Sequence, residues 1–133
     1  MLLAGCTSSV EAPATCPDIG GNYKVTATRS AGTCDPKLDP GETTVAFSKA
    51  GAGYNVIITG LSGGCPGTLD ASTCRFTANC EAKDEKSGAT IETFSLDYTF
   101  SGASFKGTGI AAARPPAVAT PCDVTYQEQG TKL

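Results

Sequence analysis

Apolar and polar residues alternate along most of the chain. The cleanest stretch is 93–100, in which Phe94, Leu96, Tyr98 and Phe100 occupy every second position. A period of two places successive side chains on opposite faces of a β-strand, whereas a helix repeats every 3.6 residues. No stretch of the chain shows a convincing helical period. The pattern therefore predicts strands throughout.

Eight segments follow this alternation, and all nine Phe and Tyr residues fall on the inward face of their segment. The inward positions are Tyr23, Val25 and Ala27; Thr43, Val45 and Phe47; Tyr54, Val56 and Ile58; Cys65 and Leu69; Cys74, Phe76, Ala78 and Cys80; Phe94, Leu96, Tyr98 and Phe100; Phe105, Gly107 and Gly109; Cys122, Val124 and Tyr126. Short connections favour an all-β, antiparallel up-and-down meander of about eight strands, forming a closed or nearly closed barrel. Closure removes exposed strand edges; a β-sandwich of the same strands is the alternative.

The N-terminal segment resembles a lipid-attachment signal. Leu3-Ala4-Gly5-Cys6 is similar to the lipobox of bacterial lipoproteins, in which an aliphatic residue and two small residues precede a cysteine. The resemblance implies that residues 1–5 are the remnant of a signal peptide. It also implies that Cys6 carries a diacylglyceryl group and fatty acyl chains such as palmitate. Thr7 after the cysteine then suggests anchoring to the outer membrane.

Three parts of the chain follow from this interpretation. Residues 1–5 are the signal-peptide remnant, 6–15 the lipidated cysteine with a flexible polar tether, and 16–133 one disulfide-stabilised β domain. The alternative for the first part is an ordinary buried segment. Seven cysteines in a small Gly- and Thr-rich chain suggest an oxidising compartment, and assigning Cys6 to the anchor leaves an even number for disulfides.

The meander confines each remaining cysteine to one end of the domain. Cys16 precedes the first strand and Cys74 opens the fifth, so both lie at the same end, and the other four lie at the opposite end. A seven-residue strand spans roughly 23 Å, while bonded cysteines need Cα atoms within about 7 Å. The predicted disulfides are therefore Cys16–Cys74, Cys65–Cys80 across one hairpin, and Cys34–Cys122 where the first and eighth strands meet.

Charge and composition exclude several functions. The net charge is −3, with 10 basic and 13 acidic residues mixed along the chain, so the basic cluster of a nucleic-acid binder is missing. The chain has no histidine, the commonest general base and metal ligand. No Cys-x2-Cys pair is present to suggest a zinc site. We therefore expect a non-enzymatic protein with no catalytic residue, metal, cofactor or nucleic-acid partner.

Two loops are rich in acidic residues, and lysines are interleaved with them. The acidic residues are Asp35, Asp39 and Glu42 in the first loop, and Glu81, Asp84 and Glu85 in the second. Solvated loop charge is the plainer interpretation, and weak calcium binding is the alternative.

Two function classes remain for a lipid-anchored envelope protein. The first is a structural or interaction module that contacts an envelope protein, a polymer or another copy of itself. Nine aromatics and six half-cystines directed inward favour a packed interior, and hence this module. The second is a barrel similar in outline to lipocalins and avidins, which the segment 100–108 resembles, holding a small apolar ligand. A cavity lined by Tyr23, Phe94 and Phe105 would favour the second class.

Overall fold

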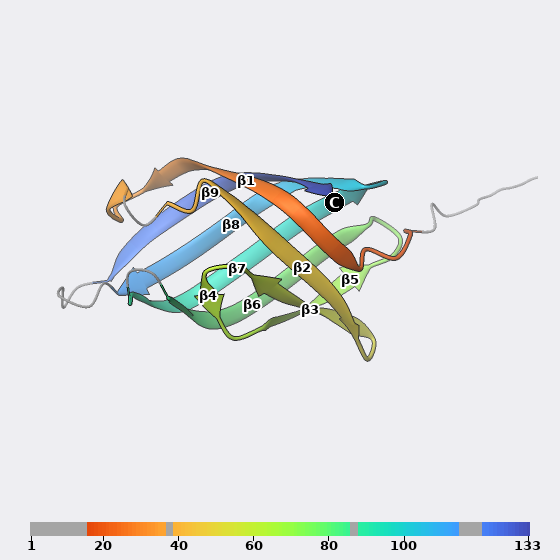
Figure 1. Cartoon of the computed structure of the whole chain (residues 1–133), viewed down its shortest axis with the longest axis horizontal. Coiled ribbons are helices and arrows are strands. Elements are labelled where there is room, and N and C mark those ends of the chain that lie inside the picture. The colour runs from red at the N-terminus through yellow and green to blue at the C-terminus, as the bar shows by residue number, and fades with distance from the viewer. Residues whose placement is uncertain (1–15, 37–38, 86–87, 115–120) are drawn as a thin grey trace, which may run out of the picture.

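The computed structural model describes residues 16–36, 39–85, 88–114 and 121–133 and folds them into nine antiparallel strands (Figure 1). The described part contains no α-helix, and thus no helix able to span a membrane. The strands are β1 (Gly21–Gly32), β2 (Glu42–Ala50), β3 (Gly53–Ile58), β4 (Leu61–Ser62), β5 (Cys65–Asp70), β6 (Arg75–Asp84), β7 (Thr90–Ser101), β8 (Ser104–Arg114) and β9 (Cys122–Lys132).

Eight of these strands form a closed barrel. Each strand pairs antiparallel with the next along the chain, with β4 left out, and β9 returns to pair with β1. The two-residue strand β4 pairs instead with the end of β6, where Leu61 lies opposite Asp84. The closed up-and-down barrel is thus confirmed in preference to the sandwich. The alternation did not predict β4, because two residues are too few to show a period.

The two ends of the barrel differ. At one end, which we call the turn end, tight turns join β2 to β3, β5 to β6 and β7 to β8, and the C-terminus lies there (Figure 1). At the other, the loop end, longer connections join β1 to β2, β6 to β7 and β8 to β9. Ile19, just before β1, is buried and its carbonyl accepts a 2.9 Å hydrogen bond from the Tyr23 hydroxyl. Residues 16–20 therefore pack against the barrel at the turn end.

Three disulfides join the pairs of cysteines expected from the sequence. Cys16–Cys74 lies at the turn end, with Cα atoms 5.2 Å apart. Cys34–Cys122 and Cys65–Cys80 lie toward the loop end, with Cα separations of 4.9 and 5.2 Å. The alternating strand directions account for this distribution, since they place each cysteine at a defined end.

Aromatic side chains fill the half of the barrel nearer the turn end. Phe105 stacks on Tyr98 with ring centroids 4.2 Å apart and meets Tyr23 edge-on at 5.6 Å. Gly130 lies opposite Phe105 in the β8–β9 pair, and a Cβ there would lie 2.1 Å from the Phe105 ring, so only glycine leaves room for it. The cluster consists of Tyr23, Phe47, Phe76, Tyr98, Phe100 and Phe105.

Small side chains occupy the inward positions nearer the loop end. Toward that end, the inward residues of β8 are Phe105, Gly107, Gly109, Ala111 and Ala113, and those of β1 are Tyr23, Val25 and Ala27. All nine Phe and Tyr residues are buried, as their inward positions in the alternating pattern predict. The inward residues therefore pack unevenly: the cluster of six rings fills one half of the barrel, and small side chains leave space in the other.

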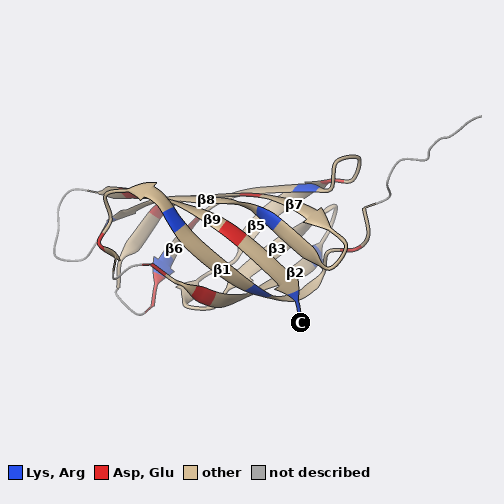
Figure 2. Ribbon diagram, turned by 90° about the horizontal axis from the view of Figure 1, so that it is seen from above, with Lys and Arg blue, Asp and Glu red and all other residues tan. Residues whose placement is uncertain are grey.

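The outer face of the barrel carries both signs of charge. Figure 2 shows Lys and Arg interspersed with Asp and Glu on the strands in view. Several are paired, among them Arg75 with Asp97 at 2.6 Å and Lys24 with Glu42 at 3.4 Å. The outer surface thus shows the mixed charge that the sequence predicts.

Candidate ligand-binding cavity

A cavity of about 310 Å³ lies inside the barrel and opens at the loop end. Its wall is mostly apolar and is built by strands from all sides of the barrel. An apolar cavity of about 150 Å³ holds benzene, and small-molecule sites begin at about 300 Å³. The space is therefore large enough for a compact organic molecule. Its apolar lining includes Ala27, Val45, Ile91, Phe94, Ala111 and Val124.

The hollow arises directly from side-chain size. Ala111 on β8 lies opposite Phe94 on β7 and Val124 on β9. Nearer the turn end, the inward position of β8 holds the ring of Phe105, whereas Ala111 has only a methyl group and leaves that space empty. Ala27 on β1 is likewise inward and buried. β8 pairs with β7 and β9 along nearly its whole length, with one register shift between Ile91 and Thr93 of β7. The wall of the barrel is therefore closed beside the small side chains that line it.

One buried acid lines this cavity. Glu128 is 7% exposed and occupies an inward position of β9, two residues after Tyr126. The Tyr98 hydroxyl donates a 2.5 Å hydrogen bond to Glu128 Oε1. Burial raises the pKa of the Glu128 carboxyl, and the Tyr98 hydrogen bond opposes this shift. Burial raises the pKa of Tyr98 well above its usual value, and the negative charge of Glu128 adds to this rise.

A glycine makes room for this carboxyl group. A Cβ on Gly109 of β8 would lie 2.1 Å from Glu128 Oε2. Any larger residue there would displace the Glu128 side chain. Gly109 and Tyr98 together hold the acid where the aromatic half of the barrel meets the cavity.

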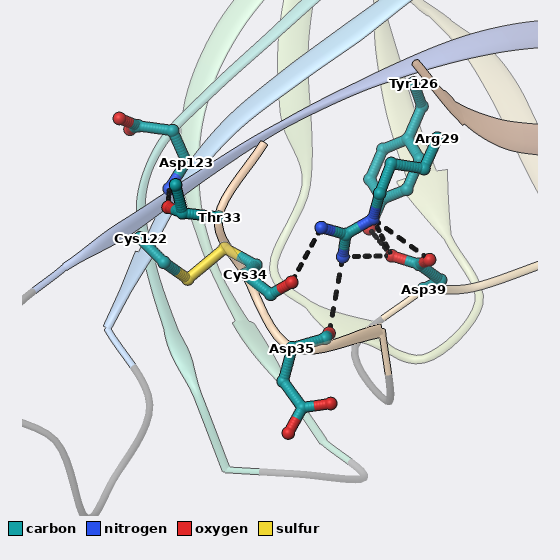
Figure 3. The surroundings of a disulfide bond; sticks show 8 residues. All are labelled: Arg29, Thr33, Cys34, Asp35, Asp39, Cys122, Asp123 and Tyr126. Carbon is teal, nitrogen blue, oxygen red and sulfur yellow. Dashed lines mark hydrogen bonds and ion pairs between the residues drawn. A yellow bond between two sulfur atoms is a disulfide. The ribbon is translucent and has the colours of Figure 1, made fainter. Parts of the chain in front are cut away.

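A polar network fixes the rim of the cavity. The Arg29 guanidinium donates to Asp39 Oδ1 at 2.6 Å and to the Cys34 carbonyl at 2.6 Å (Figure 3). The Tyr126 hydroxyl donates to the same Asp39 oxygen at 2.8 Å. Asp39, Cys34 and Tyr126 all line the cavity, so the network joins the β1–β2 connection to the barrel at its opening.

The Cys34–Cys122 disulfide lies beside this network (Figure 3). The backbone nitrogens of Thr33 and Cys34 donate to the Asp123 carbonyl at 2.6 and 3.2 Å. The Asp123 nitrogen donates in return to the Thr33 hydroxyl at 3.2 Å. The disulfide and these hydrogen bonds hold the chain after β1 against the start of β9.

The charge on Asp39 should make the stability of the rim dependent on pH. Hydrogen bonds from Arg29 lower the pKa of Asp39. Its ionised form therefore stabilises the fold above the unfolded-state pKa of about 4, and this contribution is lost as pH falls through the lower folded-state pKa. We expect Asp39→Asn to lower the melting temperature by a few degrees at neutral pH, with the difference disappearing in acid. Thermal melts of both proteins across this range measure it.

A matched control is Asp97→Asn, which removes the more exposed pair with Arg75. Exposed pairs contribute little, so its effect at neutral pH should be smaller than that of Asp39→Asn. A loss for Asp39→Asn that stayed constant into strong acid would contradict the role given to its charge.

Of the three aromatic residues predicted to line a ligand site, the structure places only Phe94 in the wall of this cavity. Tyr23 and Phe105 are buried in the aromatic cluster nearer the turn end. All three share the inward face of the barrel, but they lie at different depths along its axis.

Two features of the site were not predicted. Glu128 continues the alternation of Val124 and Tyr126, and Ala111 continues that of Gly107 and Gly109. The same period-two signal, followed to the ends of both strands, would have placed both residues inside the barrel. The rim pair Arg29–Asp39 carries no such signal, because it joins a strand to a loop.

Other predicted sites are less informative. Cys6 lies outside the described residues, so its lipidation stays a prediction. No group of three or more potential metal ligands comes together in the described ranges. In the first acidic loop, Asp39 is paired with Arg29.

Comparison with protein-family models, curated proteins and solved structures finds no match to this chain.

Proposed function

We propose that the chain binds a compact, mostly apolar small molecule in the cavity at the loop end. The single observation that carries this proposal is the hollow of about 310 Å³ that inward alanines leave in an otherwise closed and well-packed barrel. An apolar void forfeits the dispersion contacts that its lining atoms would make. A bound molecule of matching shape supplies those contacts.

The arrangement of polar groups supports the same proposal. Ligand sites combine an apolar wall with a small number of placed polar groups. Here Glu128 and Tyr126 lie among inward Ala, Val, Ile and Phe side chains, and the cavity is also lined by the polar residues Asp39, Glu42, Thr43, Thr59 and Asp84. The apolar wall would contribute affinity, and these polar groups would orient the ligand.

The interaction module, which the sequence favours, remains the rival. It needs a stable outer surface for an envelope protein or polymer, which the closed barrel and three disulfides provide. It gives no reason for a hollow interior or for a buried acid facing it. The binding barrel gives a reason for both, so we prefer it.

We further propose that binding takes place at the cell envelope. Three disulfides are typical of proteins from an oxidising compartment. The seventh cysteine, Cys6, lies in the lipobox-like segment and would attach the chain to the outer membrane. The barrel would then collect its ligand, without chemical turnover, on the periplasmic or outer side.

Filling the hollow tests the proposed binding. We expect wild-type protein to bind the neutral probe naphthylmethanol and Ala111→Phe to weaken that binding by at least about tenfold, because the new ring takes up part of the cavity. Fluorescence titration or calorimetry measures both affinities.

The matched control is Ala112→Phe, which adds the same ring one position along β8, where side chains face outward. It should bind the probe as wild type does. Equal weakening of probe binding by both variants would overturn the proposed function.

A further inference from the structure

One carboxylate oxygen of Glu128 has no hydrogen-bond donor in the part of the chain that the structure describes. Tyr98 donates to Oε1, while Oε2 accepts no hydrogen bond from any of the described residues. The side chain is 7% exposed and lines the cavity. Leaving a buried acceptor without a donor destabilises the fold, and more so when the acceptor is charged. The inner end of the cavity therefore offers an unused acceptor.

The charged side chains that line the cavity are all acidic. Four carboxyl groups line it, and among its described lining residues there is no Lys or Arg; the chain has no His. Asp39 is paired with Arg29 at the rim, and Glu42 with Lys24 on the outer side. These cations belong to rim and outer-face pairs, and neither Arg29 nor Lys24 lines the cavity. Within the described ranges, Glu128 forms no ion pair.

We propose that the cavity takes a compact organic cation, a protonated amine whose apolar body lies against Ala111 and Phe94 and whose nitrogen donates to Glu128 Oε2. This inference rests on the proposed function and deepens it. A cation compensates the charge of a buried carboxylate that has no ion pair among the described residues. An anion of the same shape would be repelled by the lining carboxylates, and a neutral alcohol would gain a weaker hydrogen bond.

The ionisation of Glu128 should then control amine binding. Tyr98 faces it from β7, and burial keeps the pKa of that hydroxyl well above neutral. The neighbouring positions are Gly107 and Gly109 on β8 and Ala27 on β1, which do not titrate. At the rim, the hydrogen bond from Arg29 keeps the pKa of Asp39 low. Glu42 and Asp84 are the other two carboxyl groups in the lining. Amine affinity should therefore fall as pH drops through the raised pKa of Glu128.

Three probes of one shape test this inference: naphthylmethylamine, naphthylmethanol and naphthoate. Hydrogen bonds to charged groups contribute about 1.5–3 kcal/mol, so the amine should bind wild-type protein roughly 10- to 100-fold more tightly than the alcohol. Naphthoate should bind most weakly. Titrations at several pH values should show the amine affinity falling in acid while the alcohol affinity stays level.

Glu128→Gln removes the charge and keeps an acceptor for the Tyr98 hydroxyl. It should abolish the preference for the amine and leave alcohol binding within about threefold of wild type. Glu81→Gln, which removes an exposed carboxylate from β6 outside this cavity, should keep the preference. The pH profile of wild-type protein gives an answer that does not depend on how either variant folds.

The outcomes separate the two proposals. Equal binding of amine and alcohol by wild-type protein, or an amine preference that survives in Glu128→Gln, would overturn the organic-cation inference while the binding cavity stands. Failure of all three probes to bind would overturn the proposed function itself.

Discussion

Removal of the Cys34–Cys122 disulfide, by Cys34→Ala with Cys122→Ala, should lower the free energy of unfolding by about 4–5 kcal/mol. The bridge joins residues 88 positions apart, and cross-linking so long a loop restricts the unfolded chain strongly. A small domain has a total stability of about 5–15 kcal/mol, so much of it would be lost. Chemical denaturation followed by circular dichroism measures the change.

The Cys65–Cys80 bridge provides the matched comparison. It spans only 15 positions, for which the same treatment gives about 3 kcal/mol. The double alanine variant of this pair should therefore be clearly more stable than that of Cys34 and Cys122. The reverse order would show that chain entropy does not determine how these bridges stabilise the barrel.

Phe105→Ala should cost about 3–5 kcal/mol, the range found when a large buried ring is deleted. The Phe105 ring is 2% exposed, stacks on Tyr98 and lies against Gly130, so its removal leaves a void that the rigid closed strands cannot collapse to fill. The unfolding free energy from denaturant titration gives the value directly.

Phe94→Ala is the control for this prediction. Phe94 is also buried, but it lines the cavity, so its removal enlarges a space that already exists. Its removal should cost visibly less than that of Phe105. Equal costs would contradict the division of the barrel into an aromatic half and a hollow half.

The sequence predicts most of the architecture because two regular features extend along the whole barrel: side chains alternate between the inner and outer face, and strands alternate in direction. Period two places Phe47 and Tyr98 on the same inner surface, although they lie on strands far apart in the chain. Strand direction alternates along a meander, so Cys16 and Cys74 fall at one end without any knowledge of register. Both properties are local and repeat along the chain.

The position of the cavity could not be predicted in the same way. The alternation shows which face of a strand a side chain occupies. The position of that side chain along the barrel axis depends on register and on the stagger between strands. Phe94 and Phe105 share a face, yet register places Phe94 opposite Ala111 and Phe105 opposite Gly130. A count of inward aromatics therefore could not show that one half stays hollow.

Polar partners were harder to predict than packing. The alternation along β9 places Glu128 on the inner face, but only the folded chain brings the Tyr98 hydroxyl of β7 to the Glu128 carboxyl group. The rim pair of Arg29 and Asp39 depends on the path of the β1–β2 connection, which alternation does not describe.

A crystal structure of the protein with naphthylmethylamine tests most directly whether the hollow half is a binding site. We expect the ring within the barrel, in contact with Ala111 and Phe94, and the nitrogen within hydrogen-bonding distance of Glu128 Oε2. A cavity filled by the protein's own side chains, or a probe bound only on the outer face, would contradict the ligand-binding barrel.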